Sequence, residues 1–571
     1  MSNFEIQKTV WEQWSRNASL YPEKDAIVHW RAGEQPVRWS FKQILQQANK
    51  FSALLLKKGI KRDHVCAIII RHNHLFYPLY MGIAGIGAIP AVLAYPNPRL
   101  HPDKFRQGIL GMSQRSGLDW ILTEEELEPI VGPLVQTEES TIKGLLFPLT
   151  WEYENEVDDE TQKELDEIRS KIEPHEPFLL QHSSGTTGLQ KPVLLSQQAV
   201  LRHVKYYGES INFSLEDKVA SWLPLYHDMG LIAAYHLPLA FGITSIQIDP
   251  FEWVLAPSLL LEAISAEKAT LSWLPNFAYN FMADRINEED MEGINLKTLR
   301  LVINCSEPVR HESHTRFLEK FAEYDFSELA LSACYAMAET TYGVTQTEPG
   351  KNIFTYNADR ESLAAGKVIP AIEGKASRVC VSSGKIIEGC QVKIVDEKRN
   401  EVENGAIGEI AITSVSMFDG YRNYPEKTAE VLIGEWFYSG DFGFMIGEEL
   451  FVIGRKKDII IVAGKNIYPE DVEDIVGKVD GVLPGRVIAF GEDDTEQGTE
   501  AVSVVAESNI ETEQEKKKLS QDIKRIGNEH DITIKNVYIV PSRWLIKSSA
   551  GKPSRKANKE RITEMKNFSS H

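Results

Sequence analysis

The stretch SSGTTGLQK, from Ser183 to Lys191, places hydroxyls, glycines and a lysine in one short loop. A loop of this composition between a strand and a following helix can point backbone N–H groups and hydroxyls at phosphate oxygens. It is not the common P-loop, because Pro192 follows the lysine where Ser or Thr is required. Taken alone, the pattern leaves two alternatives, a phosphate-binding loop and a flexible surface turn. The residues available for phosphate contacts are Ser183, Ser184, Gly185, Thr186, Thr187, Gly188 and Lys191.

Five further blocks favour the first alternative. In chain order they are NCSEP (304–308), ACYAMAETT (333–341), YSGDFG (438–443), GRKKD (454–458) and SSAGKPSR (548–555). Together with the glycine-rich loop, they resemble the ordered motifs of the adenylate-forming superfamily, which contains acyl-CoA synthetases, acyl-AMP ligases and luciferases. The resemblance extends over nearly the whole chain. It implies that the loop is the family's phosphate loop for ATP.

The resemblance also implies an ATP site with a magnesium ion, so that ATP and Mg²⁺ are the expected cofactors. Glu339 supplies the hard oxygen ligand that Mg²⁺ prefers, and Thr187 is expected to be the second protein residue at the ion. Tyr335 has a flat face for adenine, and Asp441 offers two acceptors for the ribose hydroxyls. Taken singly, these residues have ordinary alternatives: a solvated glutamate, a core tyrosine and a turn aspartate. The nucleotide-binding residues implied outside the loop are Ser306, Glu307, Pro308, Cys334, Tyr335, Ala336, Met337, Ala338, Thr340, Asp441, Arg455 and Lys552.

One position in this set departs from the family pattern. Ala338 stands where most relatives have threonine before the magnesium glutamate, so one phosphate hydroxyl is lost. Its backbone N–H remains, and we expect Thr340 to supply a hydroxyl instead.

Lys552 carries the most weight for mechanism. Transfer of AMP to a carboxylate brings together two anionic groups, so catalysis consists of positioning and of placing a cation. In the family, the lysine of the C-terminal block bridges the substrate carboxylate and the phosphate. The alternative for this basic stretch is a mobile charged tail. Lys457 matches the family's hinge position, about which the small domain rotates to present a thiol to the acyl-AMP.

The block LPLYHDMGLI, from Leu223, resembles fatty acyl-AMP ligases most closely, and His227 is expected to orient the carboxylate. The stretch SWLPNFAYNFM, from Ser272, is apolar but includes Asn276 and Asn280. It fits either an acid with a medium acyl chain or a polar short acid, and the sequence does not separate these two substrates. A connection of roughly forty residues precedes Val381, long for a compact domain. Acyl-AMP ligases carry an insertion there that is associated with disfavouring free CoA.

We therefore predict an ATP-dependent ligase that activates a carboxylic acid as acyl-AMP and passes it to the phosphopantetheine thiol of an acyl carrier protein. An acyl-CoA synthetase that uses free CoA is the alternative. A non-catalytic nucleotide-binding regulator is disfavoured, because it would not need Lys191, Glu339, Asp441, Arg455 and Lys552 together. A luciferase-type oxidase would have to be supported by light output or oxygen uptake.

The bulk composition agrees with such an enzyme. The chain has 571 residues and a formal net charge of −20, which argues against a nucleic-acid partner. Its five cysteines have no metal-ligand spacing, and the start lacks a secretory signal, so we expect a cytoplasmic protein. The uncharged run 75–95 is long enough to span a bilayer, but prolines and glycines interrupt it. We interpret it as a helix followed by a buried strand.

The elements that position these residues define the predicted fold class, α/β. Apolar helices followed by strands recur at 75–95 and 230–248, which predicts two sheet-containing α/β subdomains with buried parallel strands. Short antiparallel strands over 386–412 predict a small β subdomain. A strand, charged turn, strand, Gly loop and helix follow from Phe451. We place an N-terminal adenylation (AMP-binding) domain at 1–454 and a small, mobile α+β C-terminal domain with the catalytic lysine at 455–571.

Overall fold

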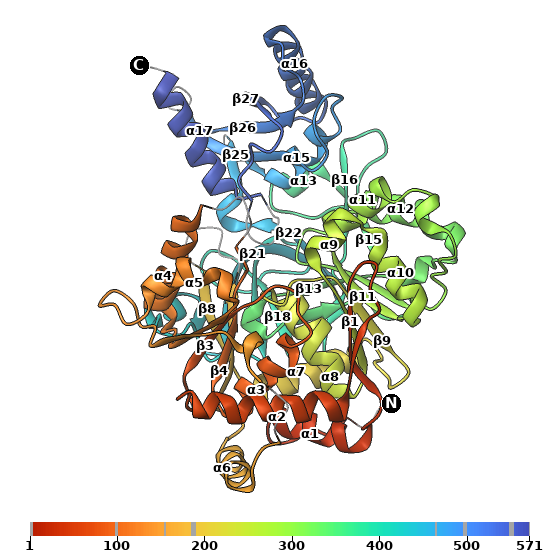
Figure 1. Cartoon of the computed structure of the whole chain (residues 1–571). Helices are drawn as coiled ribbons and strands as arrows, with labels where there is room; N and C mark the ends of the chain where they lie inside the picture. Colours follow the sequence, from red (N-terminus) through yellow and green to blue (C-terminus); the bar gives the residue numbers. More distant parts are fainter. Residues whose placement is uncertain are drawn as a thin grey trace.

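A four-stranded parallel sheet organises the first part of the chain. The computed structural model describes residues 4–96, 101–152, 156–183, 190–462, 465–494, 499–547 and 553–569 (Figure 1). The strand order of this sheet is β4-β3-β5-β6. Its strands are β3 (Val65–Ile69), β4 (Ile89–Val92), β5 (Trp120–Thr123) and β6 (Gly144–Leu146). The helices around it are α1 (Val10–Leu20), α2 (Phe41–Lys57), α3 (Phe76–Ala84), α4 (Pro102–Ser116), α5 (Glu128–Val131) and α6 (Asp159–Ser170).

A second and larger sheet begins with six parallel strands. Their order is β13-β12-β11-β9-β10-β1, and β2 (Val37–Ser40) adds an antiparallel edge. They are β1 (Asp25–Trp30), β9 (Lys218–Ser221), β10 (Thr244–Ile248), β11 (Leu271–Pro275), β12 (Leu301–Cys305) and β13 (Leu331–Ala336). The helices of this part are α7 (Gln197–Ser210), α8 (Leu237–Phe241), α9 (Pro250–Leu255), α10 (Ser258–Glu267), α11 (Asn276–Arg285) and α12 (His311–Phe321).

The small β subdomain is not a separate sheet but continues the second one. A 3₁₀ turn at Ala338–Thr340 and a positive φ of 70° at Thr341 reverse the chain, so β14 runs antiparallel to β13. The order then continues β14-β17-β22-β21-β19-β18, with β20 beside β21. The bounds are β14 (Gly343–Gln346), β17 (Lys385–Ile386), β18 (Cys390–Val395), β19 (Gly408–Ser414), β20 (Leu432–Ile433), β21 (Trp436–Ile446) and β22 (Glu449–Arg455), with α14 (Pro425–Val431) between β19 and β20.

The two apolar segments fold as the sequence predicts. The first forms α3 and then β4, and every residue of both elements is buried. The second forms a π-helix at Met229–His236, then α8, and then the buried strand β10. Within the described ranges, no helix is both long enough and apolar enough to cross a membrane.

The long connection before Val381 folds into a small unit of its own. It consists of β15 (Thr355–Asp359), α13 (Arg360–Ala364) and β16 (Ser377–Val381), and β15 pairs antiparallel with β16. Buried side chains of this unit, such as Ala358 and Cys380, pack in one cluster with Phe451 of β22 and Tyr468. The connection therefore lies between the β subdomain and the chain beyond residue 455.

The C-terminal elements gather at one end of the molecule, opposite α1 and α2 (Figure 1). They have their own hydrophobic cluster, which includes Val472, Val504 and Ile523. The predicted α+β character is confirmed by the order β25-β26-β27 and its flanking helices. The elements are β23 (Ile460–Val462), β24 (Lys465–Ile467), α15 (Pro469–Gly477), β25 (Val487–Asp494), β26 (Thr499–Ser508), α16 (Glu513–Glu529), β27 (Ile534–Pro541) and α17 (Arg555–Ser569).

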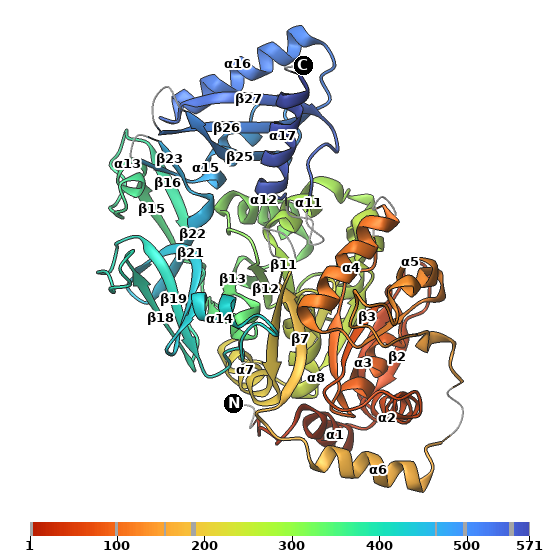
Figure 2. The same ribbon diagram turned by 90° about the vertical axis from the view of Figure 1, so that its left-hand side faces the viewer.

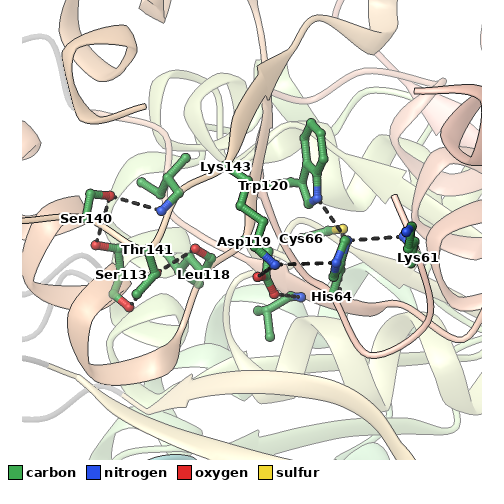
Figure 3. Close-up of polar contacts among 12 residues, drawn as sticks. Lys61, His64, Cys66, Ser113, Leu118, Asp119, Trp120, Ser140, Thr141 and Lys143 are labelled. Carbon is green, nitrogen blue, oxygen red and sulfur yellow. Dashed lines mark hydrogen bonds and ion pairs between the residues drawn. The ribbon is translucent and has the colours of Figure 1, made fainter. Parts of the chain in front are cut away.

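A polar cluster ties together the amino ends of three parallel strands in the first sheet (Figure 3). Asp119, before β5, accepts a hydrogen bond from Val65 N at 2.8 Å and pairs with Lys143 Nζ, before β6, at 2.7 Å. His64, before β3, accepts from Trp120 Nε1 at 3.0 Å. Ligands of open α/β sheets bind at the carboxyl ends of strands, so we assign this cluster a structural role.

Asp119→Ala is expected to destabilise the protein by about 1–3 kcal/mol, because it leaves the Val65 N–H without its acceptor. Lys143→Ala is the matched control. It removes a half-exposed ion pair and should cost less than about 1 kcal/mol. Urea unfolding of both variants measures the difference, and equal losses would contradict the importance of the Asp119–Val65 bond.

Candidate active site

The glycine-rich loop connects two strands rather than a strand and a helix. β7 (Pro177–Ser183) and β8 (Lys191–Ser196) form an antiparallel pair in which Ser183 lies opposite Lys191. The helix α7 (Gln197–Ser210) begins only after β8, so a strand follows the loop directly. Ser183 ends β7. The predicted loop residues Ser184, Gly185, Thr186, Thr187 and Gly188 lie outside the described residues.

Lys191 and Glu339 meet at a tyrosine that the sequence motifs did not indicate. The Tyr421 hydroxyl donates to Glu339 Oε1 at 2.6 Å and lies 3.2 Å from Lys191 Nζ. The lysine ammonium also lies 4.9 Å from the centre of the Tyr421 ring, within cation–π range. Tyr421 stands in the stretch DGYRN, between two recognised blocks, and nothing in its local sequence distinguishes it from a core tyrosine.

A second polar group links strands β13, β21 and β22. The Tyr335 hydroxyl donates to Asp441 Oδ2 at 2.7 Å, and Asp441 Oδ1 lies 3.5 Å from Arg455 Nε. Asp441 and Arg455 are direct partners in the β21–β22 register. The Tyr335 ring is 8% exposed and packs in an apolar cluster with Val344, so most of its surface belongs to the core.

Cations and carboxylates act on one another around these groups. Burial lowers the pKa of Lys191, the Glu339 carboxylate opposes that shift, and Arg455 is among the charges that lower the pKa further. Burial also lowers the pKa of Lys457, and the charges of Arg455 and Lys191 lower it more. Three cations therefore act on one another in one place, where a bound anion would relieve their repulsion.

The adenine-loop block is held by the helix beside it. Glu307 accepts a hydrogen bond from Phe277 N at 2.9 Å and so caps the first turn of α11. Ser306, at the end of β12, has a positive φ of 70°, and its hydroxyl lies 3.7 Å from Met229 Sδ. Pro308 follows in a partly exposed position. The side chain of Glu307 is thus already engaged in positioning the loop.

The remaining residues of the β13 block are largely buried. Cys334 Sγ lies 3.5 Å from the Tyr342 hydroxyl, whereas Ala336 and Met337 are partly exposed at the strand end. Ala338 is 5% exposed. The Thr340 hydroxyl lies 3.1 Å from Met337 O and 3.0 Å from Tyr342 O and is buried, so its hydrogen is engaged by the main chain.

His227 lies in the connection between β9 and the π-helix. Its Nδ1 lies 2.7 Å from Asp228 Oδ1, which in turn accepts from Met229 N. The following glycine is required by packing, because a Cβ on Gly230 would lie 2.3 Å from Pro224 O. Helices of the π type are often found at functional sites, which fits the place of this block.

The asparagines of the pocket line are engaged within the protein. Asn276 donates to Ser313 Oγ at 3.1 Å and accepts from Asn304 Nδ2 at 3.0 Å. Asn280 donates to the same Ser313 hydroxyl at 3.0 Å. Their hydrogen-bonding groups are therefore directed at neighbouring helices and strands.

Lys552 lies outside the described residues, but the chain on either side of it is fixed. An isolated β-bridge joins Lys547 and Pro553, and Ser554 N donates to Ile546 O at 3.0 Å. Arg555 then pairs with Asp458 at 3.0 Å and with Glu473 at 2.8 Å. Arg555, just after the segment that contains Lys552, thus lies beside Asp458, the residue next to the predicted hinge residue Lys457.

Comparisons with known proteins show which family the chain belongs to. Residues 14–422 match the AMP-binding enzyme family, and the chain belongs to it. A Mycobacterium tuberculosis protein named "Probable long-chain-fatty-acid--AMP ligase FadD30" is 28% identical over 574 residues and covers 95% of both chains. The medium-chain-fatty-acid–[acyl-carrier-protein] ligase JamA of Moorena producens is 30% identical over 400 residues and covers 67% of each. A fatty acyl-adenylate ligase structure from Legionella pneumophila, in complex with acyl adenylate and pyrophosphate, has a TM-score of 0.72 and 26% identity and covers 98% of both chains.

Proposed function

We propose that this enzyme activates a carboxylic acid as acyl-AMP at the expense of ATP and transfers the acyl group to the thiol of a carrier protein. The observation that carries the proposal is the convergence of Lys191, Arg455 and Lys457 with Glu339 and Asp441. Three cations brought together in an acidic chain suit the phosphates of a nucleotide triphosphate. The family membership and the names of the relatives support the same reaction.

The donor set fits a magnesium ion that arrives with ATP. Mg²⁺ is usually held by one or two carboxylates together with substrate phosphates and water. Glu339 supplies the carboxylate, and Thr187 is proposed as the second protein ligand. Among the residues described, no three His, Cys, Asp or Glu side chains form a metal cage, which agrees with this mode. When bound, the ion neutralises phosphate charge and favours the departure of pyrophosphate.

The protein's own residues supply position and charge. Tyr421 holds the Glu339 carboxylate by a hydrogen bond of 2.6 Å, and Tyr335 holds Asp441 by one of 2.7 Å, so both acceptors have fixed orientations. Asp441 and Arg455 would bind the ribose, and Lys191 the phosphates. The proposed domain boundary at 454–455 precedes the last residue of β22, just before the 3₁₀ turn Lys456–Asp458.

The acid is proposed to be predominantly apolar. The two alternatives from the sequence depended on Asn276 and Asn280, and the side-chain N–H groups of both donate to Ser313 Oγ. The surrounding α9 and α11 contribute Trp253, Phe277 and Phe281 in edge-on or tilted contact with one another. A medium or longer acyl chain suits such a wall better than a polar short acid.

The acceptor is proposed to be a carrier-protein thiol rather than free CoA. The insertion packs against β22, and Arg378 of β16 pairs with Asp471 of α15 at 3.0 Å. It thereby ties the C-terminal elements to the β subdomain in this orientation. Acyl-CoA synthesis on free CoA remains the second candidate.

Shortening the segment between Asp359 and Arg378 is expected to raise the yield of acyl-CoA at least severalfold, because the tie to α15 is loosened. Arg378→Gln, which removes only the ion pair, should produce a smaller change in the same direction. Product quantification with free CoA checks both variants. An unchanged yield would remove the insertion from the choice of acceptor.

A cytoplasmic location is proposed on the state of the cysteines. All five lie within the described ranges and are unpaired, and four of them are buried. Free thiols fit a reducing compartment.

Product mass spectrometry tests the proposed function directly. The protein is incubated with Mg²⁺-ATP, a panel of carboxylic acids, and either CoA or a phosphopantetheinylated carrier protein. Acyl-AMP that is transferred only to the carrier is the expected result. Acyl-CoA would favour the second candidate, and no adenylate from any acid would contradict the proposal.

A further inference from the structure

One face of α15 carries four carboxylates. Three arginines from distant parts of the chain bind them. The carboxylates belong to Glu470, Asp471, Glu473 and Asp474, and we call them the acidic face of α15. The three arginines are Arg310, Arg378 and Arg555. Because α15 packs in the C-terminal hydrophobic cluster through Val472 and Val476, its orientation is the orientation of that whole unit.

The three arginines have different origins. Arg555 belongs to the C-terminal unit itself and so cannot fix that unit against the rest of the molecule. Arg378 comes from the insertion. Arg310 comes from the loop that follows β12, two residues after Pro308 in the predicted adenine-loop block. It forms an ion pair with Asp474, and its Nη2 donates to Glu470 O at 3.3 Å.

The loop that carries Arg310 is itself firmly held. Arg310 N donates to Asn276 Oδ1 at 3.1 Å, and Glu307 caps the same end of α11 through Phe277 N at 2.9 Å. Asn276 is 6% exposed and is fixed in turn by Asn304. The guanidinium therefore extends from a rigid support, directly connected to the predicted nucleotide-binding residues, to the first turns of α15. Figure 2 shows α15 beside α11 and α12.

We infer that Arg310 is a positioning residue. Through its ion pair with Asp474 it sets the C-terminal unit against the predicted adenine-loop block. The inference rests on the proposed function, because its consequence is the placement of Lys552 for adenylation. Arg310 is not among the residues assigned to ATP or to the acid. It acts by holding α15, and with it the described residues on either side of Lys552 (547 and 553–555), against the predicted adenine-loop block, and this placement is the one proposed to serve the first half-reaction.

The test compares Arg310→Gln and Asp474→Asn with the charge-exchanged double variant R310E/D474R. Each single variant should lower kcat of ATP–pyrophosphate exchange about tenfold or more while KM for ATP changes little, because position rather than nucleotide binding is lost. The double variant should recover activity to within about threefold of the wild type. Transfer from preformed acyl-AMP to the carrier should not decrease in any of them.

The matched control is Glu312→Gln. Glu312 of α12 pairs with Lys478 at 3.9 Å across the same junction, but both side chains are about two-thirds exposed (63% and 64%). Such a pair contributes little, so this variant should retain wild-type exchange. Melting temperatures of all variants exclude loss of folding as the cause of any decrease.

Three results would overturn the inference. They are unchanged exchange in both single variants, equal loss of exchange and transfer, and no recovery in the double variant. A wild-type protein that forms no acyl-AMP at all would instead contradict the proposed function together with this inference. The two failures are therefore distinguishable from the wild-type measurement.

Discussion

Lys552→Ala is expected to reduce acyl-AMP formation by about 10²–10³-fold, the range found when one group that stabilises transition-state charge is removed. The physical reason is electrostatic. The attacking carboxylate and the phosphate are both anionic, and Lys191, Arg455 and Lys457 are already assigned to the nucleotide or the hinge. A cation between the two reacting groups has no substitute among them. Transfer of the acyl group from preformed acyl-AMP should be largely retained.

Two half-reaction assays measure this effect: ATP–pyrophosphate exchange for the first step, and thioester formation from synthetic acyl-AMP for the second. Lys556→Ala is the matched control, since Lys556 lies in the same basic stretch and is 54% exposed. It should behave as wild type, which would exclude a general effect of tail charge. If Lys552→Ala lost both half-reactions equally, the role assigned to Lys552 would be wrong.

Much of the fold could be predicted from the sequence, because the signals are local. In the apolar run 75–95, Gly85 and Gly87 lie between the end of α3 and the start of β4. Ser40 and Gln43 form a reciprocal capping box, a pattern visible in the sequence, and α2 begins directly after Ser40. The predicted order strand, charged turn, strand and helix after Phe451 is found as β22, a 3₁₀ turn, β23 and α15, but a further short strand, β24, precedes α15.

Two features of the fold could not be predicted, because they depend on pairing between segments. The glycine-rich loop joins β7 and β8, and the hydroxyl-rich composition is the same whether a helix or a strand follows. The β subdomain shares a sheet with the parallel strands because Thr341 adopts a positive φ, which a β-branched residue rarely does. Neither fact has a signature in the residues concerned.

The candidate site divides in a similar way. Motifs indicated Glu339, Tyr335 and Asp441, but not which protein groups hold them. The Tyr421 hydroxyl that holds Glu339 comes from 82 residues further along the chain. Similarly, Glu307 was expected to contact nucleotide, whereas its carboxylate caps α11. Second-layer partners of this kind are set by tertiary contacts, which a motif does not encode.

The protein is expected to lose stability steeply between pH 6.5 and pH 5. Among the described residues, five buried histidines and the partly buried His72 have strongly lowered pKa values, with desolvation as the largest cause in each. Burial lowers the pKa of His29 to about 2, those of His203, His236 and His314 to about 3, and those of His72 and His182 to about 4.

The sign follows from proton uptake. Near pH 5 the unfolded chain protonates these rings, with ordinary pKa values near 6.5, whereas the folded chain keeps them neutral. For each unit by which the pH falls, each ring therefore lowers the free energy of unfolding by about 1.4 kcal/mol. The six rings together lower it by roughly 8 kcal/mol per pH unit. Asp419, whose pKa burial raises to about 6, acts in the opposite direction, as does Glu470, whose pKa burial also raises, but they are fewer than the histidines.

Urea unfolding at pH 7.5, 6.0 and 5.5 measures the slope. His236→Gln should reduce it by about one proton, or 1.4 kcal/mol per pH unit, because the ring no longer titrates on unfolding. His311→Gln is the control, since His311 lies exposed at the start of α12. A free energy of unfolding that is independent of pH over this range would show that the buried rings are protonated in the folded protein. Their surroundings argue against that result, because His203 is stacked on Tyr207 and His236 is packed among Trp14, Tyr80 and Phe178, where an imidazolium would lose its hydration.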